Sequence, residues 1–245
     1  LQYGLTMQIT EAFIWTFGDA NSIMISSLLL ILLFADMPFI HSATPFFLIR
    51  SKRSVWLWGQ IIYIVLTVML YMAFVLLSTV LISMQISFSG NMWSETGAIL
   101  AYSGSGAQIA IPASIKAMIL SYPYQCASNI FFLMTFYMLF LVSFMMMINL
   151  RFKKFWGVAS GFLISVFGLL LNPQLFIQAF NLPEAVSYKA NVAVGWLSPL
   201  NHATYHMHNF GYDLLPPLWT SYLIFALLIS ICLYGTLRNL KKYNF

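Results

Sequence analysis

Three histidines lie within eight residues in the stretch NHATYHMH, residues 201–208. His202 and His206 are four positions apart, so on a helix they would share one face and could hold one metal ion. His208 would lie about 200° from His206 on the same helix, so a third ligand would require the helix to end there. The chemistry that this spacing permits is metal binding or proton sensing.

The other interpretation of these histidines is structural. In that interpretation they are polar aromatic residues of an interfacial loop, hydrogen-bonded to the backbone. We favour it and predict neither a bound metal nor catalytic residues. A membrane-embedded, metal-dependent enzyme stays open as an alternative, in which Glu184 or Asp213 would assist the histidines. The chain contains no G-x-x-x-x-G-K-[ST] motif, so we do not expect it to cradle nucleotide phosphates or to hydrolyse ATP itself.

The composition indicates the solvent that surrounds these residues. The 245 residues are 61% hydrophobic and only 7% charged, and the mean hydropathy is +0.85. A soluble domain carries roughly 25% charged residues, so the surroundings must be largely lipid. The isoelectric point near 9.2 does not indicate nucleic-acid binding, because the cations do not gather on one soluble face.

Five apolar runs are long enough to cross a bilayer, which requires about 20 residues in a helix. We therefore expect an all-α, polytopic helical bundle that forms one membrane domain over residues 1–245. The run at 109–120 is too short, and we expect it to be interfacial or re-entrant. The predicted spans are 17–38, 56–83, 128–150, 156–177 and 216–237.

Nine of the eleven cationic residues lie in three clusters, which follow the first, third and fifth predicted spans. These places share one side of the membrane if all five spans cross. The positive-inside rule makes that side cytoplasmic, so we expect a cytoplasmic C-terminus in a plasma membrane, which we take to be bacterial. The predicted anchors are Arg50/Lys52/Arg53, Arg151/Lys153/Lys154 and Arg238/Lys241/Lys242.

The parity of the spans has a consequence for the N-terminus. Five crossings with an inner C-terminus would place residue 1 outside, and the first residues, LQYGLTMQITEAFIW, have no initiator Met and no signal-peptide pattern. We therefore expect a further transmembrane helix before residue 1, which would give six in the full protein. The alternative is that residues 1–18 form an unusual natural N-terminus.

The segment FADMPFIHSATPFFLIRSKR, residues 34–53, is more than a simple turn between two spans. Two prolines punctuate it, and apolar residues lead directly into the first cation cluster. The part at 41–50 is expected to form a short helix along the membrane, with Phe46 and Phe47 toward a groove and Arg50 and Arg53 toward lipid phosphates or a protein. The alternative is an ordinary helix end without a partner.

This layout resembles the membrane subunits of six-helix ABC exporters, the permeases of drugs, peptides and polysaccharides. With one helix added in front, residues 36–53 match the family's coupling helix, NLRFKKFWG (149–157) its basic inner loop, and 179–217 its outer re-entrant element. The outer segment 84–127 is longer than the tight turn usual in the family. On this resemblance, the contacts to the ATPase are Asp36, Phe39, His41, Phe46, Phe47, Arg50 and Arg53, and the outer loop includes Glu184, His202, His206 and His208.

The resemblance implies a transporter without chemistry in this chain. A separate ATP-binding cassette subunit would bind ATP and Mg²⁺, and a second permease copy, identical or related, would complete the dimer. The centres of the second to fifth spans contain no ionisable residue, so the usual residues of an ion-driven carrier are absent. Walls rich in Met, Phe, Leu and Tyr fit a hydrophobic or amphipathic cargo, such as a peptide, an antibiotic or a lipid-like molecule. An ATP-independent carrier or channel is the remaining alternative.

Overall fold

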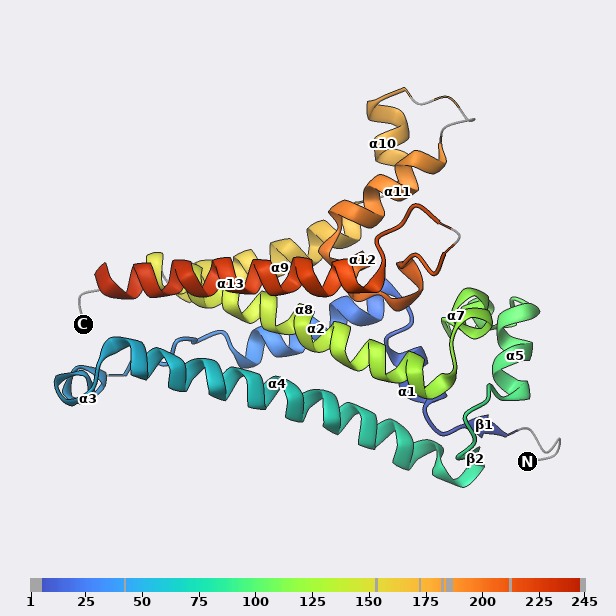
Figure 1. Cartoon of the computed structure of the whole chain (residues 1–245), viewed down its shortest axis with the longest axis horizontal. Helices are drawn as coiled ribbons and strands as arrows, with labels where there is room; N and C mark the ends of the chain where they lie inside the picture. The colour runs from blue at the N-terminus through green and yellow to red at the C-terminus, as the bar shows by residue number, and fades with distance from the viewer. Residues whose placement is uncertain are drawn as a thin grey trace.

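The computed structural model describes residues 6–41, 43–152, 154–171, 173–181, 183, 187–211 and 213–242, with only the backbone of Phe47, Arg50 and Lys154. The described chain is almost entirely helical (Figure 1), as predicted. Its elements are β1 (Met7–Gln8), α1 (Glu11–Thr16), α2 (Ala20–Leu33), α3 (Thr44–Arg50), α4 (Arg53–Ser83), η1 (Met84–Ile86), β2 (Ser87–Phe88), α5 (Glu95–Tyr102), α6 (Ser105–Gln108), α7 (Ile115–Leu120), α8 (Pro123–Arg151), α9 (Lys154–Leu170), α10 (Pro173–Ala179), α11 (Tyr188–Leu197), α12 (Pro199–Ala203), η3 (Tyr205–Met207) and α13 (Leu218–Lys242).

Three of the described helical segments are long and apolar enough to cross a membrane: Arg53–Ile86, Pro123–Arg151 and Leu218–Lys242. The 29 residues of α8 span roughly 44 Å at 1.5 Å per residue, against about 30 Å of hydrocarbon. The most apolar stretch of α8 is 67% buried, whereas those of α4 and α13 are 17% and 22% buried. Helix α8 is therefore the centre of the packing, and the other two expose most of their apolar surface.

The fourth predicted span, 156–177, is bent. Helices α9 and α10 meet at 73° and are long enough to cross a membrane only when taken together. Pro173 stands at the first position of α10, where a helix can begin but cannot continue unbroken from the residues before it. The structure therefore has up to four candidate spans among its described residues.

The first predicted span, 17–38, is shorter than the sequence indicated. Helix α2 has 14 residues, which extend roughly 21 Å. The Asp19 side chain caps its start by accepting a hydrogen bond from the Ser22 N–H at 3.2 Å, and residues 34–39 turn away after Leu33. The apolar run continues through this turn, which is why composition alone overestimated the helix.

Short elements cover the end of the bundle where β1, α1 and α5–α7 gather (Figure 1). Strands β1 and β2 pair in parallel, Met7 with Ser87 and Gln8 with Phe88. Buried Glu11 joins the same two segments, because its carboxylate accepts from Ser94 N at 2.8 Å and Ser94 Oγ at 2.6 Å. The predicted interfacial run at 109–120 contains only the six-residue helix α7.

Candidate functional site

Members of the three cation clusters lie at the opposite end of the molecule, the left of Figure 1, where α3, the start of α4 and the end of α13 lie, whereas Lys116 of α7 and Lys189 of α11 lie away from it. We call the end that holds the clusters the basic end. Arg53 Nη1 donates hydrogen bonds to the carbonyls of Leu240 at 3.0 Å and Lys241 at 3.1 Å. Arg151 and Arg238 line one hollow. All three clusters thus have members at one end, as the sequence predicted; Lys153 lies outside the described residues.

Helix α3 forms within the segment that the sequence singled out. Thr44 begins it, and its Oγ1 accepts a hydrogen bond from the His41 N–H at 2.9 Å. Phe46 is 71% exposed and Ile49 80% exposed, and their spacing of three residues places them on one face. Helix α3 therefore presents a small apolar surface beside the basic end. Phe47 and Arg50 belong to the helix, but their side chains lie outside the described part of the structure.

The loop before α3 is held tightly to two long helices. Asn149 of α8 donates through Nδ2 to the carbonyls of Ala35 at 3.2 Å and Met37 at 2.7 Å. The Phe39 N–H donates to Gln60 Oε1 of α4 at 3.2 Å. A displacement of this loop must therefore move α8 and α4 as well.

Aromatic packing strengthens the same attachment. The Phe39 ring lies edge-on to Tyr63 of α4, with 5.6 Å between centroids, and stacks with His41 at 6.3 Å. Two predicted ATPase contacts, Phe39 and His41, thus contact each other, and Phe39 is half-buried against α4. Asp36 is exposed in the turn between the two carbonyls that Asn149 binds.

Arg53 makes a contact within the chain that the sequence did not indicate. We expected its guanidinium to face lipid phosphates or a protein, but it binds the last carbonyls of α13. The final carbonyls of a helix have no partner within the helix, so a nearby cation is a favourable donor. Arg53 therefore fastens the start of α4 to the end of α13.

Replacement of Asn149 by leucine should loosen the loop before α3. The change leaves two carbonyls without their donor, and a buried polar group without a partner costs about 1–3 kcal/mol. We expect faster trypsin cleavage in the segment that holds Lys52 and Arg53, followed by mass spectrometry. Cleavage after Lys189, which is exposed in α11 away from this loop, is the internal control. Equal acceleration at both places, or none, would contradict the assignment of Asn149 as the anchor.

At the opposite end from the cation clusters, His202 and His208 lie on either side of a serine of α13. The Ser221 Oγ lies 2.7 Å from His202 Nδ1 and 2.8 Å from His208 Nε2, and all three side chains are buried. The other ring nitrogens contact carbonyls, His202 Nε2 that of Trp196 at 3.0 Å and His208 Nδ1 that of Tyr205 at 3.0 Å. The bonds to the backbone agree with the structural interpretation of these histidines; the serine was not foreseen.

This arrangement does not support the metal hypothesis for His202 and His206. Helix α12 ends at Ala203, and extended Thr204 follows it, so the two histidines do not share one helical face. Both ring nitrogens of His202 are already hydrogen-bonded to the protein. In the part of the chain that the structure describes, no group of three or more His, Cys, Asp or Glu side chains could hold a metal ion.

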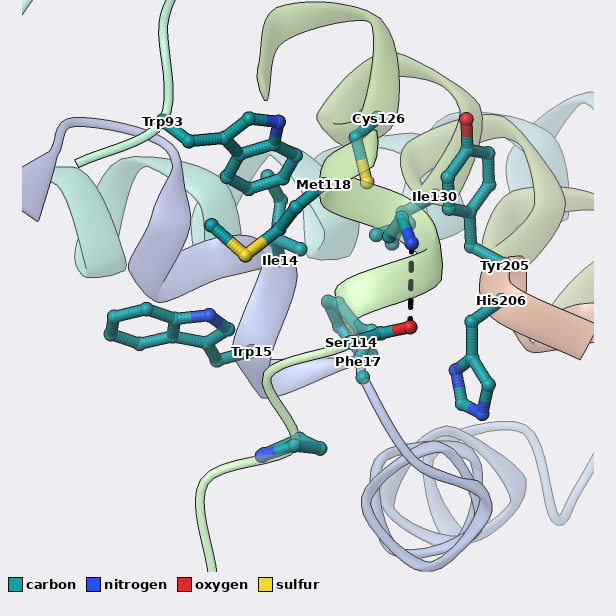
Figure 2. Close-up of a pocket in the computed structure, with 13 residues that line it drawn as sticks. Ile14, Trp15, Phe17, Trp93, Ser114, Met118, Cys126, Ile130, Tyr205 and His206 are labelled. Atoms are coloured by element: carbon teal, nitrogen blue, oxygen red, sulfur yellow. Dashed lines mark hydrogen bonds between the residues drawn. The ribbon is translucent and has the colours of Figure 1, made fainter. Parts of the chain in front are cut away.

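His206 lines a separate small pocket between α1, α7, α8 and η3. The pocket volume is about 20 Å³, which is room for about one water molecule. Figure 2 shows His206 and Tyr205 on one side of this pocket and Trp15 and Trp93 on the other. Burial lowers the pKa of His206, and the nearby charge of Lys116 lowers it further.

Asp213 does not join the histidine cluster around Ser221. Asp213 forms an ion pair with Lys116 near α7, and the Lys116 ammonium also lies 5.6 Å from the Phe210 ring centroid. Glu184 lies outside the described residues. Because both partners of the ion pair are partly exposed, it contributes at most about 1 kcal/mol and serves to join α7 to the loop before α13.

The protonation of the histidine cluster predicts a pH dependence. A carbonyl only accepts hydrogen bonds, so the ring protons lie on the nitrogens that face Trp196 and Tyr205. The single Ser221 proton can then serve only one imidazole. A further proton would supply the missing donor, but burial lowers the pKa of His202 and, most strongly, lowers that of His208 to about 4.

We therefore expect the protein to lose stability as the pH falls from about 6.5 toward 4. In that window the unfolded chain takes up a proton that the folded cluster excludes. For His208 alone, the resulting loss in the free energy of unfolding is about 3 kcal/mol in all. Unfolding in detergent, followed by near-ultraviolet circular dichroism at several pH values, measures this loss. His208→Gln should flatten the profile, and an unchanged profile in that variant would contradict the assignment.

Comparison of this chain with protein-family models, with curated proteins and with solved structures finds no match. The assignment of function therefore depends on the chain's own residues. Sequence reasoning missed Asn149 and Gln60, which hold the loop before α3, and Ser221, which holds the histidine segment before α13. The available signal was a polar side chain at the end of, or inside, an apolar run, as in MMMINL and LWTSYLIF.

Proposed function

We propose that this chain is the membrane subunit of an ATP-driven exporter, similar to the six-helix class of ABC permeases. A separate ATP-binding cassette subunit, with ATP and Mg²⁺, docks on α3. The observation that carries the proposal is the exposed apolar pair Phe46 and Ile49, on a short helix outside the bundle and beside the basic end. A short helix with exposed anchors at i and i+3 suits a groove on a partner protein.

The contacts of the inner loop support a mechanical role. A push on α3 acts on residues 34–41, which Asn149 joins to α8 and Gln60 joins to α4. Arg53 carries the same displacement to the end of α13. Closure of the ATPase would therefore move three long helices together, rather than deform one flexible loop.

In this proposal the basic end is cytoplasmic, following the positive-inside rule. The membrane-crossing elements of the described chain in this proposal are α2, α4, α8, the bent pair α9–α10, and α13. Helix α2 and the bent pair are the least regular of these. Short and broken helices in membrane proteins are tolerated where protein or a water-filled cavity satisfies the backbone. We place the transport path beside them, between two copies of the chain.

The exposed apolar surface of the long helices fits such a dimer and a hydrophobic cargo. Apolar side chains that are more than half exposed line α4, among them Leu66, Leu70, Phe74, Leu77 and Leu81. They face lipid or the second permease. The cargo that suits walls of this kind is hydrophobic or amphipathic, such as a peptide, an antibiotic or a lipid-like molecule.

Purification of the full-length protein from its native host in a mild detergent tests the proposal. Mass spectrometry of the co-purifying proteins should find a subunit with a phosphate-binding loop. A protein that is reproducibly pure, without an ATPase, would contradict the proposal. Transport in liposomes without ATP would favour a carrier or channel instead.

A further inference from the structure

The hollow between α8 and α13 at the basic end has the chemistry of a lipid headgroup site. It has a volume of about 900 Å³, and Arg151, Arg238 and Lys242 line it. All three cations are exposed, and no aspartate or glutamate is among the described residues that line it. Three converging positive charges without a counter-charge select an anion. We name this the basic hollow.

The two helices give the basic hollow a fixed floor. A Cβ on Gly235 would lie 2.5 Å from Sδ of Met147, so the missing side chain leaves room for Met147 to pack directly against α13. Beside it, Asn239 Nδ2 donates to the Met147 carbonyl at 3.1 Å. The spacing of the cations on α8 and α13 is therefore set by packing and does not depend on the anion.

The side chains along α13 change from charged to apolar over two turns on one face. Lys242 and Arg238 are one turn apart, and Tyr234 and Ile231 follow one and two turns deeper. This sequence of cation, aromatic and aliphatic side chains matches the order of phosphate, interface and hydrocarbon in a bilayer. A free phosphate would use only the first of these layers.

A second hollow, lined by apolar residues apart from Ser160, adjoins the first across Ile148 and Phe152, which line both. Its volume is about 400 Å³, and Trp156, Ala159 and Leu163 are among the residues that line it. A charged hollow that borders an apolar one is the shape required by a molecule with an anionic head and a hydrocarbon tail.

We propose that the basic hollow binds the headgroup of an anionic phospholipid, with an acyl chain over Phe152 in the adjoining apolar hollow. The inference requires that α8 and α13 lie in a membrane, but it does not depend on the ATPase partner. Charge complementarity favours an anionic lipid over a zwitterionic one, and the apolar continuation favours a lipid over a soluble anion.

Native mass spectrometry of the purified full chain, titrated with phosphatidylglycerol or with phosphatidylcholine of the same acyl chains, tests the proposal. We expect phosphatidylglycerol to bind more tightly to the wild type. Arg151→Gln/Arg238→Gln should weaken its binding about 30-fold, and Lys242→Gln about 5-fold. Lys241→Gln is the matched control, because Lys241 is adjacent and exposed but does not line the hollow; its effect should be less than about twofold.

Three outcomes would overturn the proposal. The first is equal weakening by Lys241→Gln and Lys242→Gln, which would indicate non-specific surface charge. The second is equal affinity of the wild type for the two lipids. The third is displacement of phosphatidylglycerol by millimolar inorganic phosphate, which would indicate a soluble-anion site. Association with an ATPase subunit, measured separately, would stay intact in each case.

Discussion

Phe46→Asp should abolish the association of this chain with its ATPase subunit while leaving its own fold intact. Burial of an aromatic anchor in a partner's pocket contributes 2 kcal/mol or more, so its loss weakens binding about 30-fold or more. The charge of aspartate adds a desolvation cost in the same pocket. The chain itself loses little, because the Phe46 side chain is 71% exposed.

The measurement is the amount of ATPase subunit retained on the purified chain, together with ATP hydrolysis by the complex. Phe155→Asp is a matched control, since Phe155 is 73% exposed in the first turn of α9 at the same end of the molecule. Phe46→Leu should retain most of the association. If Phe46→Asp and Phe155→Asp behave alike, α3 is not the docking element.

Ser221→Ala should destabilise the protein by about 1–3 kcal/mol. The hydroxyl lies between His202 and His208 in a fully buried site. The hydroxyl has one proton and donates to only one of these imidazoles, so its removal deprives that nitrogen of its donor, and an unpaired buried group costs about 1–3 kcal/mol. Denaturation of the purified protein in detergent measures the free energy of unfolding.

Ser230→Ala, in the same helix, is the control for this change. The Ser230 hydroxyl is exposed and donates to the Ala226 carbonyl of its own helix at 2.7 Å, so its loss should cost less than about 0.5 kcal/mol. An equal effect of the two substitutions would show that Ser221 contributes only as a helical residue. Selective loss in Ser221→Ala would establish that the cluster holds α12 and η3 against α13.

The long helices were predictable from sequence because one local property determines them. A run of about 20 predominantly apolar residues is a candidate membrane-spanning helix, and α4, α8 and α13 follow such runs. The same property overestimated the length of α2. Asp19 caps the start of this helix, and Asn149 donates a hydrogen bond to the turn after Leu33. That contact joins residues more than a hundred positions apart, which no local pattern can indicate.

The candidate sites also divide into features that local sequence signals indicate and contacts between distant residues that they do not. The sequence indicated a helix near Phe46 and a shared side for the cations, because proline spacing and charge clusters are local signals. It did not indicate that Arg53 binds the carbonyls of Leu240 and Lys241, or that His202 and His208 meet Ser221. These contacts depend on how the helices pack, so only the structure reveals them.

Photo-crosslinking in native membranes tests the central claim most directly. A photoreactive phenylalanine analogue at position 46 should crosslink to a protein with a phosphate-binding loop. The same analogue at Leu227, which is 62% exposed on α13, should crosslink only to lipid or to a second copy of the chain. If position 46 also yields only lipid, α3 rests on the membrane surface, and the chain does not couple to an ATPase through it.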